Sequence, residues 1–137
     1  MRFRFMAALG VVVACSSRLP HPPYAKHPTS ALVAVGFPPP PAKFEFVPEQ
    51  PSSDAVWIDG EGGWRGKRWR WKWGRWVVAP KGATFSPWTQ VRDQDGNLFF
   101  ASGTWRDAEG HDIAEPPTLA RGRISAAELE DGGPERP

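Results

Sequence analysis

The 137-residue chain contains a single cysteine, Cys15, so it cannot form an internal disulfide. It also lacks a long apolar run near its start: the uncharged stretch of residues 6–14 is far shorter than the roughly 20 residues of a membrane-spanning helix. Histidines are few, and His21 and His27 have no carboxylate or thiol near them in the sequence, so no metal site is predicted. The fold must therefore be stabilised without disulfides or metal.

The first fifteen residues have the layout of a secretory signal. Arg2 and Arg4 precede the apolar stretch, and small residues lead up to Cys15. The sequence Val-Val-Ala-Cys at residues 12–15 resembles the lipobox of bacterial lipoproteins, whose cysteine is acylated and becomes the first residue after cleavage. The resemblance implies a signal peptide at residues 1–14, lipidation of Cys15 and membrane attachment in the cell envelope, and Ser16 is compatible with the outer membrane. An ordinary secreted protein with a chance cysteine is the alternative.

Charges are segregated along the chain. The total of 17 Lys and Arg against 15 Asp and Glu becomes 15 against 15 once Arg2 and Arg4 are removed with the signal. Residues 64–81 contain seven cations and no acid, whereas residues 107–137 contain eight acids and three cations. This asymmetry indicates either attraction to an anionic surface or neutralisation of one segment by the other.

Proline dominates the region before the tryptophans. Residues 16–53 include ten prolines, a density that excludes helix and interior strand. We therefore predict that residues 15–53 form a disordered Pro-rich tether that could reach on the order of 100 Å in a polyproline II conformation. Two apolar islands, residues 31–35 and 44–47, leave open the addition of an edge strand to the downstream domain.

All eight tryptophans lie in residues 54–124, which predict the folded domain. Each indole can bury roughly 150–250 Å², enough to build a core in a small domain. Tryptophans and cations alternate over residues 68–73, the period of a β-strand with its rings on one face. The predicted fold class is mainly β, a small antiparallel meander of hairpins, followed at residues 125–137 by a short helical turn and an acidic tail.

A weak internal repeat supports paired hairpins. In each unit a tryptophan begins the first strand, a turn that contains glycine reverses the chain, and the return strand ends in Gly-x-Trp. The corresponding positions are Trp57, Gly66, Gly74 and Trp76 in the first unit and Trp88, Gly96, Gly103 and Trp105 in the second. Trp76 is one residue out of phase with the preceding ring series, which predicts a bulge near Gly74.

Residues 71–76, Trp-Lys-Trp-Gly-Arg-Trp, resemble the motif of the YXWGXW-repeat family, small bacterial envelope proteins that often carry lipoprotein signals. Trp71 stands where the motif has tyrosine, and Trp73, Gly74 and Trp76 match it. The resemblance implies a β-rich envelope protein without an assigned activity, and it supplies no catalytic residue.

Candidate catalytic groups are isolated. The acidic loop at residues 93–97 lacks the acid that a calcium-binding EF-hand requires at its twelfth position and predicts a hairpin turn. His111 and Asp112 have no accompanying nucleophile motif, and Asp59 and Glu61 are expected to face solvent and pair with cations of the next strand. We predict no enzymatic activity, no cofactor and no metal.

The segment with the composition of a binding surface is the predicted strand pair rich in Arg, Lys and Trp. The candidate binding residues are Arg65, Arg68, Trp69, Arg70, Trp71, Lys72 and Trp73. Three hypotheses follow: a structural or adhesive module of the envelope, which is favoured; a module that binds glycan or peptidoglycan; and a module that docks a partner protein through its tryptophan face. Export disfavours nucleic acid as a partner. The hypotheses differ in how far the rings are exposed.

Overall fold

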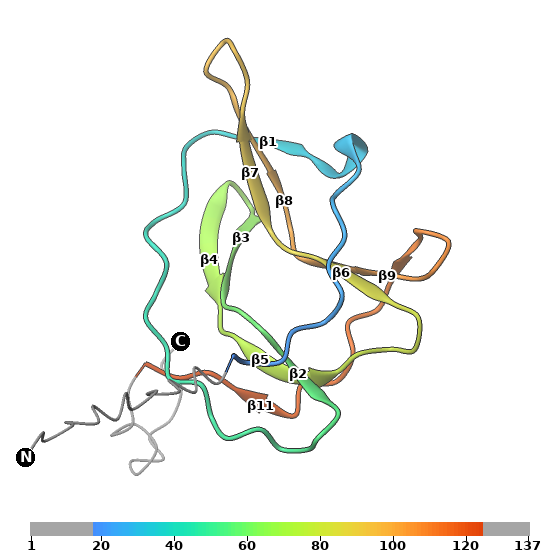
Figure 1. The fold of residues 1–137 in the computed structure, drawn as a ribbon. Coiled ribbons are helices and arrows are strands. Elements are labelled where there is room, and N and C mark those ends of the chain that lie inside the picture. Colours follow the sequence, from blue (N-terminus) through green and yellow to red (C-terminus); the bar gives the residue numbers. More distant parts are fainter. Residues whose placement is uncertain (1–17, 125–137) are drawn as a thin grey trace, which may run out of the picture.

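The computed structural model describes residues 18–124, so the predicted signal peptide, Cys15 and the tail of residues 125–137 lie outside the described residues (Figure 1). The mainly β prediction is confirmed, and every strand ladder is antiparallel. Within residues 18–124, no helix is long and apolar enough to cross a bilayer. The elements are the 3-10 helix η1 (Thr29–Ala31) and the strands β1 (Val33–Val35), β2 (Ala55–Ile58), β3 (Glu61–Arg65), β4 (Arg68–Lys72), β5 (Arg75–Val78), β6 (Thr84–Ser86), β7 (Thr89–Arg92), β8 (Leu98–Ala101), β9 (Thr104–Arg106), β10 (Asp112–Ile113) and β11 (Ala120–Arg121).

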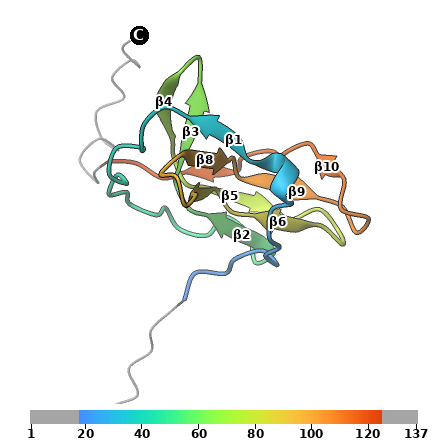
Figure 2. The same ribbon diagram turned by 90° about the horizontal axis from the view of Figure 1, so that it is seen from above.

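Eight of the strands form two units of the same design. In the first unit the outer strands β2 and β5 pair with each other and the inner strands β3 and β4 form a hairpin. In the second, β6 pairs with β9, and β7 and β8 form the inner hairpin. The remaining strands extend these pairs: β11 joins β5, β10 joins β9, and β1 joins β8 (Figures 1 and 2).

Aromatic pairs across the outer strands form the centre of each unit. Trp57 lies directly opposite Trp76, with ring centroids 5.4 Å apart. Phe85 lies opposite Trp105 at 5.3 Å, and all four side chains are buried. Phe85 is therefore the counterpart of Trp57, whereas Trp88 lies between β6 and β7. The correspondence that the sequence suggested between Trp57 and Trp88 is corrected by this pairing.

The glycine of each Gly-x-Trp sequence allows a side chain to approach the backbone closely. Gly74 lies in the break between β4 and β5, and Gly103 in the break between β8 and β9. A Cβ atom at either position would overlap a carboxylate and an aromatic ring of the partner strand. The groups concerned are Glu45 and Trp57 at Gly74, and Glu61 and Phe85 at Gly103. Only glycine fits such a site without displacing its neighbours.

Strand β4 has the predicted alternation. Its cations Arg68, Arg70 and Lys72 are exposed, and the intervening Trp69 and Trp71 are half-buried. The turn that joins β3 to β4 has two residues, Gly66 and Lys67, with φ angles of 58° and 59°. Two consecutive positive φ angles characterise the type I′ turn, whose twist matches that of a hairpin.

The tryptophan face of the β3–β4 hairpin is covered by the second unit. Trp69 packs edge-on against Phe100 of β8, with centroids 4.9 Å apart, and against Trp64 at 5.1 Å. The indole Nε1 of Trp69 donates to the carbonyl of Phe37 at 2.9 Å. These rings therefore form a second aromatic cluster rather than a free surface.

The Pro-rich segment differs from its prediction. Residues 18–53 follow the surface of the β domain: the carbonyl of Pro20 accepts the N–H of Trp57 at 2.7 Å, and that of Pro23 accepts the N–H of Phe85 at 2.8 Å. Of the two apolar islands, the first supplies β1 and the second pairs through Phe46 with Arg123. Proline has no N–H to donate, but its carbonyl still accepts, so a proline-rich chain can line a strand edge. A disordered tether does not describe residues 18–53.

Glu45 fastens this segment to the first unit. Its carboxylate accepts the backbone N–H of Gly60 at 2.9 Å and that of Gly74 at 2.8 Å. These two amides lie at the two breaks between the inner and outer strands of that unit. Hydrogen bonds to a charged acceptor are roughly twice as strong as neutral ones, so Glu45 holds both breaks in place.

Candidate functional site

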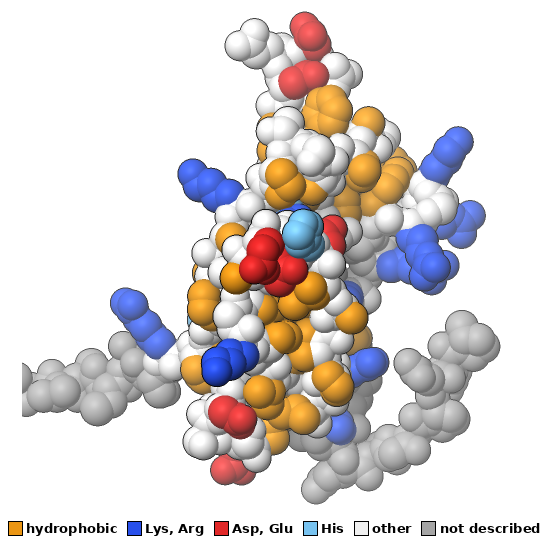
Figure 3. All heavy atoms as spheres, turned by 90° about the vertical axis from the view of Figure 1, so that its right-hand side faces the viewer, with side chains coloured by type: hydrophobic (Ala, Val, Ile, Leu, Met, Phe, Trp, Pro, Cys, Tyr) orange, Lys and Arg blue, Asp and Glu red, His pale blue; other side chains and the backbone are white. Residues whose placement is uncertain are grey.

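The residues proposed from the sequence as a binding face do not share one surface. Arg65, Arg68 and Arg70 are exposed on one face of the β3–β4 hairpin, whereas Trp69 packs on the other. Figure 3 shows several Lys and Arg side chains gathered at its upper right edge. This is the side of the molecule on which the β3–β4 hairpin lies, at the top of Figure 2. A single ligand cannot contact both sets on the body of the hairpin.

The remaining three predicted residues meet at a hollow of about 360 Å³ at the end of β4. The lining residues come from the end of β4, from β5, from the segment after β10 and from β11. They are Trp71, Lys72, Trp73, Arg75, Glu115, Thr118 and Arg121. The rings of Trp71 and Trp73 stand nearly perpendicular, with centroids 6.4 Å apart, and Lys43 Nζ lies 5.5 Å from the centroid of Trp73. We call this the β4-end hollow.

A cluster of four charges lies at this hollow: Lys72, Arg75 and Glu115 line it, and Glu61 lies next to both cations. Arg75, only 2% exposed, directs Nη2 toward Glu61 Oε1 at 3.5 Å and donates from Nε to Glu115. Lys72 Nζ lies 2.5 Å from Glu115 Oε2 and 3.6 Å from Glu61 Oε1. Glu61 thus pairs with a cation of the next strand as expected, but it is buried, which corrects its predicted exposure. The Glu61 carboxylate packs against Gly103 of the second unit, where a Cβ atom would overlap it, and this contact accounts for its burial.

The two carboxylates differ in their protonation equilibria. Burial raises the pKa of Glu61 and outweighs the opposing charges of Arg75 and Lys72. Burial acts in the same direction on Glu115, but the hydrogen bond from Lys72 and the charges of Arg75 and Lys72 together hold the pKa of Glu115 below its ordinary value. Of the two carboxylates, Glu61 is therefore the one that takes up a proton at the higher pH.

One cation at the β4-end hollow, Arg121, has no carboxylate partner among the described residues. Arg121 stands directly opposite Arg75 in the β11–β5 ladder, and it makes no ion pair with any residue in 18–124. Arg75 is already paired with Glu61 and Glu115, whereas Arg121 is exposed, so Arg121 is the cation that an anion at the hollow would contact. Arg75 Nη1 and Trp71 Nε1 are buried donors with no hydrogen-bond partner among the described residues, although such groups are normally satisfied. The hollow is thus suited to an anionic group beside an apolar face.

The other candidate sites have structural roles. Asp93 accepts the N–H of Asp95 at 3.0 Å and that of Asn97 at 2.8 Å, which makes the loop a hairpin turn, as predicted. The side-chain hydrogen bond from Asn97 is the main cause that lowers the pKa of Asp93. No group of three or more potential metal-ligating side chains occurs in the described part of the chain.

The three histidines are also engaged in structural contacts. Asp107 accepts the backbone N–H of His111 at 2.8 Å, whereas Asp112 pairs with Arg106 at 2.9 Å, so His111 and Asp112 form no dyad with each other. His27 Nε2 lies 2.8 Å from the carbonyl of Pro87, and His21 Nδ1 lies 3.0 Å from that of Trp57. These contacts join the N-terminal segment to the domain.

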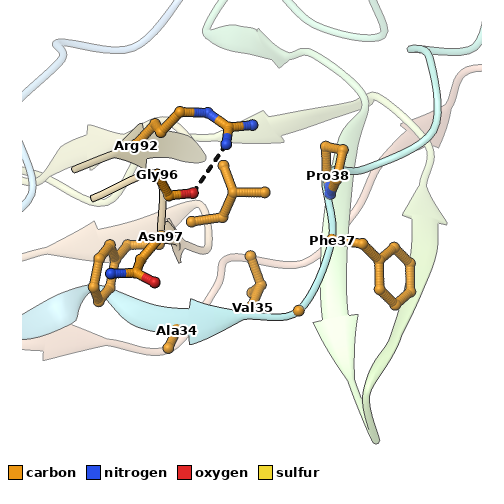
Figure 4. A pocket seen from close by; sticks show the side chains of 10 residues that line it. Ala34, Val35, Phe37, Pro38, Arg92, Gly96 and Asn97 are labelled. Atoms are coloured by element: carbon orange, nitrogen blue, oxygen red, sulfur yellow. Dashed lines mark hydrogen bonds between the residues drawn. The ribbon is translucent and has the colours of Figure 1, made fainter. Parts of the chain in front are cut away.

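A larger hollow of about 530 Å³ lies between β1 and the β7–β8 hairpin (Figure 4). Its one cation, Arg92, donates to the carbonyl of Gly96 at 2.9 Å and so belongs to its own loop. In Figure 4 the ring of Phe37 points away from the hollow, in agreement with its packing on Trp64. This hollow offers few polar groups that converge on a ligand, which makes it a weaker candidate than the β4-end hollow.

Glu115, Thr118 and Arg121 were missed by sequence reasoning. They lie some forty residues after β4 and reach it only because β11 pairs with β5. The one signal in the sequence was the excess of acid in residues 107–137 against the excess of base in residues 64–81. This charge asymmetry predicts that the two segments attract each other, but it does not predict which strands pair or in which register.

No family model matches the chain, and no match was found among curated proteins or solved structures. The likeness to the YXWGXW-repeat family therefore stays a prediction carried by the motif at residues 71–76.

Proposed function

We propose that this protein is exported, acylated at Cys15 and attached to the bacterial cell envelope, at the outer membrane, where its Trp-rich β domain is a non-catalytic adhesive module. The lipobox-like sequence at residues 12–15 supports the anchor. We further propose that the module binds an anionic glycan of the envelope at the β4-end hollow. The supporting observation is the combination of two indole rings with the exposed Arg121, which has no carboxylate partner among the described residues.

The chemistry of the hollow matches a sugar acid. The C–H face of a pyranose ring can lie against an indole, and a carboxylate or phosphate on the same sugar can accept from arginine. Arginine presents a fork of donors that matches such oxyanions, and charge-assisted hydrogen bonds are stronger than neutral ones. Peptidoglycan and envelope polysaccharides are the polymers that carry these groups in the proposed compartment.

The protein-docking hypothesis receives less support. Trp57, Trp76 and Trp105 are buried, and the other five tryptophans are half-buried. Trp64 and Trp69 already pack against Phe37 and Phe100. The faces of these two rings are therefore partly covered by the protein itself and offer a partner less apolar area than a free tryptophan face would. A purely structural role remains the alternative if no ligand binds.

Binding to polygalacturonate, with dextran as the neutral control polymer, tests the proposal. We compare wild type with Arg121→Gln, which removes an exposed cation of the hollow, and with the double variant Arg68→Gln, Arg70→Gln, which removes two exposed cations of β4 that do not line the hollow. We expect Arg121→Gln to weaken binding about tenfold or more, because one charge-assisted contact contributes roughly 1.5–3 kcal/mol. The double variant should change mainly the salt dependence.

Co-sedimentation with isolated peptidoglycan extends the test to the native polymer. Loss of sedimentation in Arg121→Gln alone would support the β4-end hollow. Equal effects of both variants would indicate diffuse attraction of a polyanion, and unchanged binding in both would contradict the proposed site.

A further inference from the structure

The first described residues are fixed to the domain by four hydrogen bonds. The Pro20 carbonyl accepts from Trp57 N–H at 2.7 Å, and His21 Nδ1 lies 3.0 Å from the Trp57 carbonyl. A few residues on, Phe85 exchanges backbone hydrogen bonds with the chain on either side of Tyr24, at 2.8 Å and 3.0 Å. Residues 20–25 are therefore part of the domain surface and cannot act as a spacer.

The distance from the proposed anchor to this surface has an upper limit set by covalent geometry. Cys15 precedes Pro20 by five residues. A fully extended chain spans at most about 3.6 Å per residue, so five residues reach no further than about 18 Å. A folded domain of this size has a radius of gyration of about 13 Å, so the connection is shorter than the domain is wide. Part of that reach is used within the headgroup layer itself.

We propose that the surface formed by residues 18–26 lies against the headgroups of the bilayer that holds the anchor. This inference rests on the proposed acylation of Cys15. A tether of residues 15–53 would have allowed the domain to stand far from the membrane, and the observed attachment at Pro20 removes that freedom.

The chemistry of this surface matches an anionic bilayer. Between Arg18 and Phe44 the chain contains no Asp or Glu, while Arg18 and Lys26 are exposed cations. Leu19 and Tyr24 are also exposed, at 36% and 53%. Basic residues near an anionic surface are attracted by about 1 kcal/mol each, and aromatic side chains such as tyrosine favour the headgroup level.

The orientation has a consequence for the cationic hairpin. In both Figure 1 and Figure 2 the turn between β3 and β4 lies well away from the first described residues. A domain seated on residues 18–26 therefore presents the β3–β4 turn away from the bilayer. The exposed arginines of this hairpin then face the space in which envelope polymers lie.

Energy transfer to the membrane surface tests this placement. The full chain, purified with its native lipid from membranes, is reconstituted into vesicles of phosphatidylethanolamine and phosphatidylglycerol that contain a headgroup-linked acceptor. A donor is attached through Lys26→Cys, near the proposed contact, or through Lys67→Cys, at the β3–β4 turn. We expect clearly greater transfer from position 26 than from position 67. Insertion of twenty Gly/Ser residues between Ser17 and Arg18 should reduce the difference, because such a spacer reaches about 25 Å on average.

Mass spectrometry of the same preparation separates the two possible failures. An unmodified Cys15 would overturn the proposed anchor and this inference with it. An acylated Cys15 with equal transfer from positions 26 and 67 would overturn the inference alone. A charge control, Arg18→Gln with Lys26→Gln in the Lys67→Cys background, should increase transfer from position 67, because a less firmly seated domain tilts more freely.

Discussion

The replacement of Gly74 by alanine gives a direct test of the packing in the first unit. A Cβ atom at this position would overlap the ring of Trp57 and lie 2.5 Å from Glu45 Oε1 and 3.0 Å from the carbonyl oxygen of Ile58. Trp57 is 1% exposed, so its ring has no room to move aside. Glu45 can move, but it would then lose its hydrogen bond to the Gly74 amide.

The expected loss of stability follows from these contacts. Overpacking a buried site costs about 1–3 kcal/mol, and loss of a hydrogen bond to a charged group costs about 1.5–3 kcal/mol. The two costs overlap, since movement of Glu45 relieves part of the clash, and alanine regains about 0.4–1 kcal/mol by restricting the unfolded chain. Because the two costs overlap and are partly offset, we expect Gly74→Ala to lower the free energy of unfolding by about 2–4 kcal/mol, less than the two costs added together.

Urea denaturation followed by tryptophan fluorescence measures this loss. Gly36→Ala is the matched control, because a Cβ at Gly36 would meet no atom within 4 Å. That variant should have wild-type stability or gain up to about 1 kcal/mol. Equal transition midpoints for Gly74→Ala and Gly36→Ala, with unchanged m values, would refute the packing argument.

Three further predictions concern the carboxylates. The pKa of Glu61 is raised in the folded state, so ionisation of Glu61 makes the folded state less stable as the pH rises from about 4.5 through the folded pKa. The variant Glu61→Gln lacks this loss. In urea titrations, the stability of the variant relative to wild type should therefore improve between pH 4 and pH 7. The pKa of Glu115 is lowered in the folded state, so the stability that ionised Glu115 contributes is present above the unfolded pKa and is lost as the pH falls through the folded pKa. Glu115→Gln should therefore be more destabilising at pH 7 than at pH 3. The opposite order would contradict the ion cluster. Glu45→Ala removes the acceptor of two backbone amides and should lower stability by about 2–4 kcal/mol while it increases amide hydrogen exchange at Gly60; unchanged exchange there would show that the carboxylate does not hold the break.

Local patterns in the sequence predicted local structure well. The alternation of tryptophan and cation over residues 68–73 specified a strand, because side chains project to opposite faces with a period of two. The glycine turns at residues 66 and 96 both occur at hairpin reversals with positive φ angles. These features depend on residues adjacent in sequence, so no tertiary information was needed.

The long-range parts could not be predicted in the same way. The Pro-rich segment was predicted to be free because proline cannot donate to a ladder, yet its carbonyls accept from Trp57 and Phe85. Which strand edge they line depends on the assembled sheets. The β4-end hollow likewise requires the pairing of β11 with β5, and the two strands are separated by more than forty residues. Short C-terminal strands of two residues carry too little pattern to predict their partners.

The indole N–H resonances of the eight tryptophans provide the most direct test of the proposed binding site. Oligogalacturonate is titrated into the isotope-labelled protein, and each resonance is assigned by replacing one tryptophan with phenylalanine. We expect saturable shifts at Trp71 and Trp73, which line the β4-end hollow, and little change at the buried Trp57 and Trp76. Saturable shifts confined to Trp64 and Trp69, or no shift at any indole, would contradict the proposed site.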